Sequence, residues 1–277
     1  MKKLWLAVLS LGMAGVLTAC GGSAGPSGNN SPPPESSKAA VAEQGILAQG
    51  YRQLGQNIQQ RAISLQTDLT LQMDIDGEQV EMSLNSEDQI QLFGERKYAS
   101  ASTMKVLGQT IEMKSYMDEE HYYTQVGGQT IKVPQGQAAH AWDTLLINPV
   151  AGATILSEEE KVLDDGRKEV HLSLKGGKLE DQMNQLFTSL YGDGIRMTLE
   201  ELTMTGWLSK DGSAEKVEAS IRYTMDLAGQ TVGVTGNWTT DYLPMAEGTD
   251  IRPPAGLNIA DAVDGDGLEL PGNPVAA

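Results

Sequence analysis

The sequence predicts an α+β domain in which antiparallel strands predominate. The first observation is a long alternation of apolar and polar side chains over residues 63–75, which has the period of a half-buried strand. The second is a short phrase, a glycine turn followed by an alternating strand, that recurs along the chain. The third is a spacing of three and four between apolar residues over residues 38–60, 136–148 and 178–191, which is typical of amphipathic helices.

Residues 1–19 have the features of an export signal. Two lysines precede an apolar run over residues 4–17, which is too short to cross a membrane. The segment Leu17-Thr18-Ala19-Cys20 follows, and it resembles the lipobox of bacterial lipoproteins. That resemblance implies a lipoprotein signal peptide over residues 1–19 and a diacylglyceryl group on Cys20. The alternative is an ordinary signal peptide with an incidental cysteine near its end.

Composition narrows the possible partners. Cys20 is the only cysteine in the chain, which excludes an internal disulfide. The formal net charge of −17 repels nucleic acid, so no nucleic-acid partner is expected. No second apolar stretch reaches spanning length. We therefore expect a protein on the extracytoplasmic face of the bacterial cell membrane, held there by its lipidated cysteine.

Residues 20–37 are rich in Gly, Ser, Asn and Pro and contain almost no apolar side chains. Such a segment cannot bury enough surface to fold, so we interpret it as a disordered tether between the lipid and the domain. The helical spacing over residues 38–60 begins the folded part. It is weakened by Gly45, Gly50 and Gly55, because glycine disfavours helix interiors.

A meander of strands follows the first helix. Residues 63–75 lead into Asp76-Gly77, a dipeptide that favours a hairpin turn, and residues 80–84 return as the second strand. Further alternating strands are predicted over residues 89–93, 97–106, 110–117, 121–126 and 130–133. The repeated phrase begins at Gly77, Gly108, Gly128 and Gly229, and its irregular spacing favours hairpins in one sheet over a solenoid.

The second half of the chain again combines helical and alternating strand patterns. A helix over residues 136–148 ends before Pro149, a hairpin joins residues 161–163 to 170–174, and a second helix covers residues 178–191. The apolar positions then change from odd to even near Glu200-Glu201, which predicts a β-bulge. Strands are predicted over residues 217–227 and 232–242, and residues 258–277 read as a flexible acidic tail.

This order of elements resembles the LolA/LppX-like lipoprotein superfamily, and within it a widespread group of lipoproteins from Gram-positive bacteria. The resemblance rests on the lipobox, the polar tether, the methionine-bearing meander, and the closing segment Ile251-Arg252-Pro253-Pro254. It implies a single domain over residues 38–257. The expected fold is a curved antiparallel sheet, an incomplete β-barrel, with helices covering the concave face. Relatives with known roles carry lipids or lipidated proteins in the apolar cavity of that fold.

Catalytic motifs are weak. Ser102-Thr103-Met104-Lys105 matches the S-x-x-K pattern of acylating enzymes, but its companion motifs are absent. In a strand, Ser102 and Lys105 would also point to opposite faces. We therefore expect no enzyme activity and no catalytic residue.

Metal and cofactor signals are weak as well. His121, His140 and His171 are isolated in the sequence, and a zinc site or catalytic triad would need long-range convergence. The acidic residues from Asp261 to Glu269 do not fit the spacing of a calcium loop. No cofactor and no metal are expected.

Methionine is abundant, with 12 residues, whereas phenylalanine is scarce, with 2. Flexible thioether side chains adapt to apolar ligands of varied shape, although they also fill ordinary cores. The candidate cavity lining comprises Met73, Met82, Met104, Met113, Met117, Met197, Met204 and Met225. The expected function is a non-enzymatic cell-surface lipoprotein that binds a lipid or other apolar ligand. The alternative is a protein interaction or scaffold module of the envelope, in which these methionines are merely core.

Overall fold

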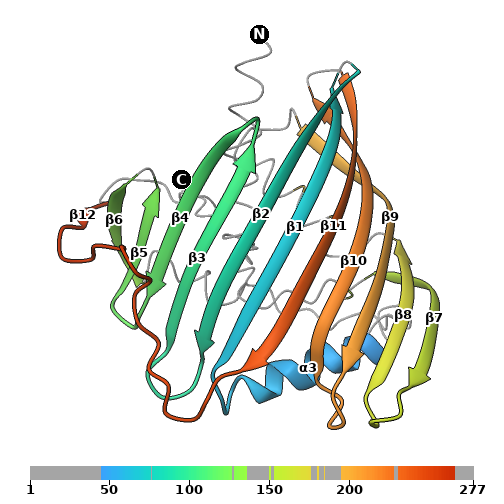
Figure 1. Cartoon of the computed structure of the whole chain (residues 1–277), viewed down its shortest axis with the longest axis horizontal. Coiled ribbons are helices and arrows are strands. Elements are labelled where there is room, and N and C mark those ends of the chain that lie inside the picture. The colour runs from blue at the N-terminus through green and yellow to red at the C-terminus, as the bar shows by residue number, and fades with distance from the viewer. Residues whose placement is uncertain are drawn as a thin grey trace, which may run out of the picture.

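The computed structural model describes residues 45–75, 77–126, 128–135, 150, 153–175, 180, 184, 195–227 and 230–265. They form one twisted, open sheet of 12 strands in the order β12-β6-β5-β4-β3-β2-β1-β11-β10-β9-β8-β7 (Figure 1). Neighbouring strands are antiparallel, except that β12 runs parallel to β6. The two meanders, β1–β6 and β7–β11, are joined where β1 pairs with β11.

The strands are β1 (Ile63–Ile75), β2 (Glu78–Gln91), β3 (Lys97–Val106), β4 (Gln109–Met117), β5 (His121–Val126), β6 (Gln129–Pro134), β7 (Thr154–Val162), β8 (Lys168–Lys175), β9 (Ile195–Leu208), β10 (Ala214–Leu227), β11 (Gln230–Pro244) and β12 (Val263–Asp264). The helix α3 spans Ile46–Asn57.

Most of the predicted strands are confirmed, but residues 89–91 continue β2 rather than form a separate strand, and β7 begins at Thr154 rather than at Lys161. Residues 63–75 form β1 with the predicted bounds, and β1 pairs with β2 through a turn in which Gly77 has φ +80°. The predicted bulge is also present, because Arg222 of β10 lies opposite Glu201 while Tyr223 lies opposite Leu199. The extra residue restores the alternation, so that apolar side chains on both sides of the bulge reach the same face.

The predicted helical cover of the concave face needs correction, and the fold is mostly β rather than α+β. In the described residues, α3 is the one helix with assigned bounds, and its main contacts are with β10 and β9. A helix of 12 residues is about 18 Å long, whereas a sheet of 12 strands is roughly 50 Å wide. One such helix covers only part of the sheet.

The two other predicted helices fall mostly outside the described residues. The whole of 136–148 lies there, and of residues 178–191 only Glu180 and Asn184 are described, both helical. Asn184 binds the backbone of β9 near the start of the strand. Its side-chain amide accepts a hydrogen bond from Met197 N at 2.6 Å and donates one to Met197 O at 2.9 Å. The amide therefore takes the place of a neighbouring strand beyond the end of β8.

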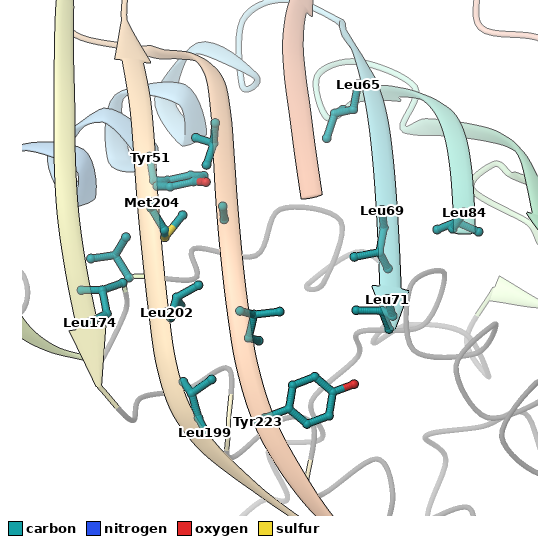
Figure 2. Close-up of a cluster of buried hydrophobic side chains, with 14 of the residues drawn as sticks. Tyr51, Leu65, Leu69, Leu71, Leu84, Leu174, Leu199, Leu202, Met204 and Tyr223 are labelled. Atoms are coloured by element: carbon teal, nitrogen blue, oxygen red, sulfur yellow. The ribbon is translucent and has the colours of Figure 1, made fainter. Parts of the chain in front are cut away.

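The side of the sheet that α3 contacts, called the inner face here, carries the main hydrophobic core. Figure 2 shows Leu174, Leu202 and Tyr223 projecting to this face from β8, β9 and β10. The side chains of Leu174 and Leu202 are completely buried. The carboxylate of Glu158 on β7 fixes the start of α3 by accepting a hydrogen bond from Ile46 N at 2.8 Å. A carboxylate there satisfies a helical N–H that would otherwise have no partner.

Gly206 of β9 allows α3 to approach the sheet closely, and Gly206→Ala is expected to destabilise the protein. A Cβ atom at this position would lie 2.3 Å from Leu47 Cδ1 of the helix. Overpacking of this kind costs about 1–3 kcal/mol of unfolding free energy. Chemical denaturation measures the loss. Gly233→Ala in β11 is the matched control, because a Cβ there meets nothing within 4 Å. Equal stability of the two variants would contradict this packing.

The opposite side of the sheet, the outer face, is covered over β3 and β4 by residues 245–262, called the strap here. Ile251 and Leu257 of the strap are buried and form a second cluster with Ala99 and Tyr116. Asp250 accepts a hydrogen bond from Lys97 Nζ at 2.8 Å, and this contact lowers the pKa of Asp250. The chain then adds β12 to the edge of β6. Residues 258–265 of the predicted tail therefore belong to the described structure.

Candidate functional site

The eight candidate methionines all lie on the inner face. Each belongs to the main core cluster and is at most 7% exposed. Met104 lies opposite Leu84 and Ile111, and Met197 lies opposite Met225, so strand pairing brings them together with other apolar side chains. The structure thus places the eight on one apolar surface. Their role as ligand lining stays a prediction.

The inner face carries partly buried aromatic side chains on β11. Trp238 of β11 is only partly buried and packs against the core between Leu69 of β1 and Ala219 of β10. Four residues further along β11, the ring of Tyr242 meets the ring of Tyr51 edge to face, with centroids 6.1 Å apart. The Tyr242 hydroxyl donates a hydrogen bond to the Tyr51 hydroxyl at 3.4 Å. Burial raises the pKa of Tyr242 to about 12, so this pair is neutral at physiological pH.

A band of polar side chains crosses the inner face at this level. We call it the hydroxyl belt, and it comprises Thr67, Ser86, Asp88, Ser100, Ser102, Ser115, Thr124 and Thr240. These residues face one another across neighbouring strands, from Thr240 of β11 through Thr67 and Ser86 to Ser102, and from Asp88 through Ser100 and Ser115 to Thr124. Four of them, Ser100, Ser102, Ser115 and Thr240, are buried.

Most of the belt is internally hydrogen-bonded. The Tyr98 hydroxyl donates to Asp88 Oδ1 at 2.8 Å, and Ser86 Oγ donates to Asp88 Oδ2 at 2.7 Å. At the other end, Ser115 Oγ lies 3.1 Å from the Tyr122 hydroxyl. Burial, and then the negative charge of Asp88, raise the pKa of Tyr98 well above its usual range. Tyr98 therefore stays protonated and remains a donor to the carboxylate.

The sequence patterns above do not predict the belt, although β3 carries a signal for it. Residues 98–102 read Tyr-Ala-Ser-Ala-Ser, in which the inward positions are polar and the outward ones are alanine. This reverses the usual rule that a half-buried strand turns its apolar residues to the core. The reversal is possible because the strap packs on Ala99 from the outer face. Polar residues at the inward positions of a strand, alternating with alanine at the outward ones, are therefore the sequence signal for this belt.

The catalytic and metal candidates do not form a site. Ser102 is buried on the inner face, whereas Lys105 is exposed on the other side of β3, as the strand parity predicts. His171 lies on the outer face, with Nε2 2.6 Å from Glu169 Oε1, and His140 lies outside the described residues. Within the described ranges, no group of three His, Cys, Asp or Glu residues is placed to hold a metal ion.

The outer face carries a shallow groove of about 460 Å³ across β7–β11. Its polar lining includes Glu159, His171, Thr205, Glu218 and Asn237. His171 Nδ1 lies 3.0 Å from Thr205 Oγ1, so the imidazole is held by neighbours on both of its nitrogens. The groove is an open, hydroxyl-rich and acidic surface, distinct from the apolar inner face.

Structural comparisons find similarity to bacterial lipoproteins of known structure, at low sequence identity. LprF from Mycobacterium bovis matches with a TM-score of 0.34 and 14% identity, over 79% of this chain and 98% of that one. LppX from Mycobacterium tuberculosis matches with a TM-score of 0.35 and 10% identity, over 78% of this chain and 100% of that one.

An outer-membrane lipoprotein-sorting protein domain from Vibrio parahaemolyticus matches with a TM-score of 0.23 and 9% identity, over 79% of this chain and 96% of that one. The sequence resemblance named the same group of lipoproteins, and the similarity found is one of structure at low sequence identity. No protein-family model and no curated protein sequence matches the chain. No helix in the described ranges is long and apolar enough to span a membrane.

Proposed function

We propose that the protein is a membrane-anchored lipoprotein that binds a lipid or similar apolar ligand against the inner face of its sheet. The anchor is a diacylglyceryl group on Cys20, on the extracytoplasmic face of the cell membrane, and residues 20–37 are the tether. The domain over residues 38–257 carries the ligand. No catalytic step is part of this role.

The observation that carries the proposal is the Met-rich inner face of an open sheet. Eight methionines from six strands share one apolar surface. Unbranched thioether side chains can repack around acyl chains of different shapes at little cost. The partly buried Trp238 lies on the same surface and offers a broad apolar ring. Apolar sites with a few polar groups are the common form of small-molecule binding sites.

Trp238→Ala is expected to weaken binding of a neutral apolar probe about tenfold or more, which corresponds to about 1.4 kcal/mol. The probe is diphenylhexatriene, whose fluorescence rises in an apolar environment, and the protein is the secreted form without its lipid. Trp207→Ala is the matched control. Trp207 belongs to β9 but contacts Lys216 Nζ on the outer face, 5.3 Å from the ring centroid.

The control is expected to bind within twofold of the unmodified protein. Circular dichroism establishes that both variants are folded, and Trp238→Phe, which keeps an aromatic ring, is expected to recover most of the binding. Loss of binding in both tryptophan variants, or in neither, would count against an inner-face site. So would failure of the unmodified protein to bind the probe.

A protein interaction module of the envelope is the second candidate. The edge strand β7 favours it, because Leu156 and Val162 are 61% and 65% exposed there and the neighbouring outer groove is acidic. An envelope partner captured in stoichiometric amount, and lost on Glu218→Lys in the groove, would support this role. If such a partner is captured and the protein carries no lipid, the interaction module is favoured over the lipid-binding role.

A further inference from the structure

We propose that the hydroxyl belt recognises the headgroup of an uncharged, hydroxyl-bearing lipid, while the methionine surface beside it receives the acyl chains. This inference rests on the proposed function and specifies its ligand class. It makes the inner face a site for an amphiphile with a fixed orientation. A purely apolar pocket would offer no such orientation.

Ser102 supplies the first argument. Its side chain is 5% exposed, and its Oγ atom has no hydrogen-bond partner among the described residues. A buried hydroxyl without a partner is costly and uncommon in native proteins. It lies between Ser86 and Met113 on the neighbouring strands. A ligand hydroxyl or ester oxygen at this point would complete the hydrogen bonding of the belt.

The accessibility of the belt supplies the second argument. Thr67, Ser86, Asp88 and Thr124 are partly exposed, whereas the buried serines Ser100, Ser102 and Ser115 lie between them on β3 and β4. The partly exposed residues can therefore be reached from solvent, and the belt continues from them to the buried serines. A core network with a purely structural role would gain nothing from a partly open rim and an unused hydroxyl.

Charge selects the class of headgroup. Asp88 is the one carboxylate of the belt, and among the described residues it has no ion-pair partner. Its oxygens accept hydrogen bonds from the neutral hydroxyls of Tyr98 and Ser86. A phosphate brought to this surface would meet that negative charge, and repulsion in a partly buried site is poorly screened. A glycerol or sugar hydroxyl can instead donate to the carboxylate and accept from serine.

The position of the methionines gives the orientation. Met104 follows Ser102 on the same side of β3, and Met113 lies directly opposite Ser102 on β4. The inward neighbours of Thr67 on β1 are Leu65 and Leu69, both buried. The belt thus borders apolar surface, and an acyl chain ester-linked to a headgroup in the belt would reach that surface directly.

The test compares two lipids with identical acyl chains, a diacylglycerol and the corresponding phosphatidic acid, by displacement of diphenylhexatriene from the secreted form. We expect the diacylglycerol to bind at least tenfold more tightly. Ser102→Ala is expected to weaken diacylglycerol binding about fivefold without lowering the unfolding temperature, because it removes a hydroxyl that makes no hydrogen bond among the described residues. Asp88→Asn is expected to strengthen phosphatidic acid binding and so to reduce the difference in affinity between the two lipids.

Ser83→Ala is the matched control, since Ser83 lies on β2 but faces outward. It is expected to leave both affinities unchanged. Equal or tighter binding of phosphatidic acid, or unchanged diacylglycerol binding in Ser102→Ala, would overturn the headgroup assignment. If the apolar probe still binds in that case, the proposed function stands and only this inference fails. If neither probe nor lipid binds, both fail.

Discussion

A Cys20→Ser variant is expected to incorporate no fatty acid at all, and this is the largest effect that we predict. Serine lacks the thiol that carries the diacylglyceryl group in bacterial lipoproteins. Two acyl chains bury tens of methylene groups at about 0.8 kcal/mol each, which makes their anchoring practically irreversible. Growth with an alkyne-labelled fatty acid, followed by fluorophore coupling and gel electrophoresis, measures the modification.

A Ser27→Ala variant controls for changes in the tether, because it keeps Cys20 and the preceding Leu17-Thr18-Ala19. It is expected to carry as much label as the unmodified protein. Detergent-phase partitioning gives an independent readout, in which the unmodified protein enters the detergent phase. Label on the Cys20→Ser protein would refute the anchor and leave the ordinary signal peptide as the better interpretation.

The double variant Ile251→Ala with Leu257→Ala is expected to lose about 4 kcal/mol or more of unfolding free energy. Both side chains lie in the strap and are buried against Ala99 and Tyr116 on the outer face, with exposures of 1% and 7%. Truncation of a buried Ile or Leu to Ala typically costs about 2–5 kcal/mol. For a domain of this size we expect the unfolding temperature to fall by roughly 10 °C or more. Differential scanning calorimetry measures it.

Ile259→Ala is the matched control, because Ile259 belongs to the same strap but is 39% exposed. It is expected to change the unfolding temperature only slightly. A double variant as stable as this control would mean that the strap does not contribute to the fold. The inner-face hydroxyls of β3 would then lack the outer packing that allows them to replace apolar residues.

Strand parity made most of the sheet predictable. A single alternation sets which residues of β1 face the core, and the change of parity at Glu200-Glu201 locates the bulge without further information. The pairing of β1 with β11 is different. It joins segments separated by most of the chain, and no local pattern encodes which strands become neighbours across such a distance.

The candidate site was predicted only in part. Methionine at inward positions marks an apolar surface, and the eight chosen residues all lie on it. The hydroxyl belt was missed because each of its serines, taken alone, reads as a solvent-facing strand residue. Ser100 and Ser102 can face inward because the strap covers Ala99 on the other side, and that is a contact over about 150 residues of sequence that only the folded chain reveals.

Native mass spectrometry tests the central claim most directly. The Cys20→Ser protein would be purified from the bacterium that makes it and sprayed under conditions that keep noncovalent complexes intact. We predict an added mass that organic solvent removes and that fragments as an uncharged lipid with acyl chains. A protein that repeatedly carries no ligand, and that also fails to take up diacylglycerol offered in excess, would contradict lipid binding on the inner face.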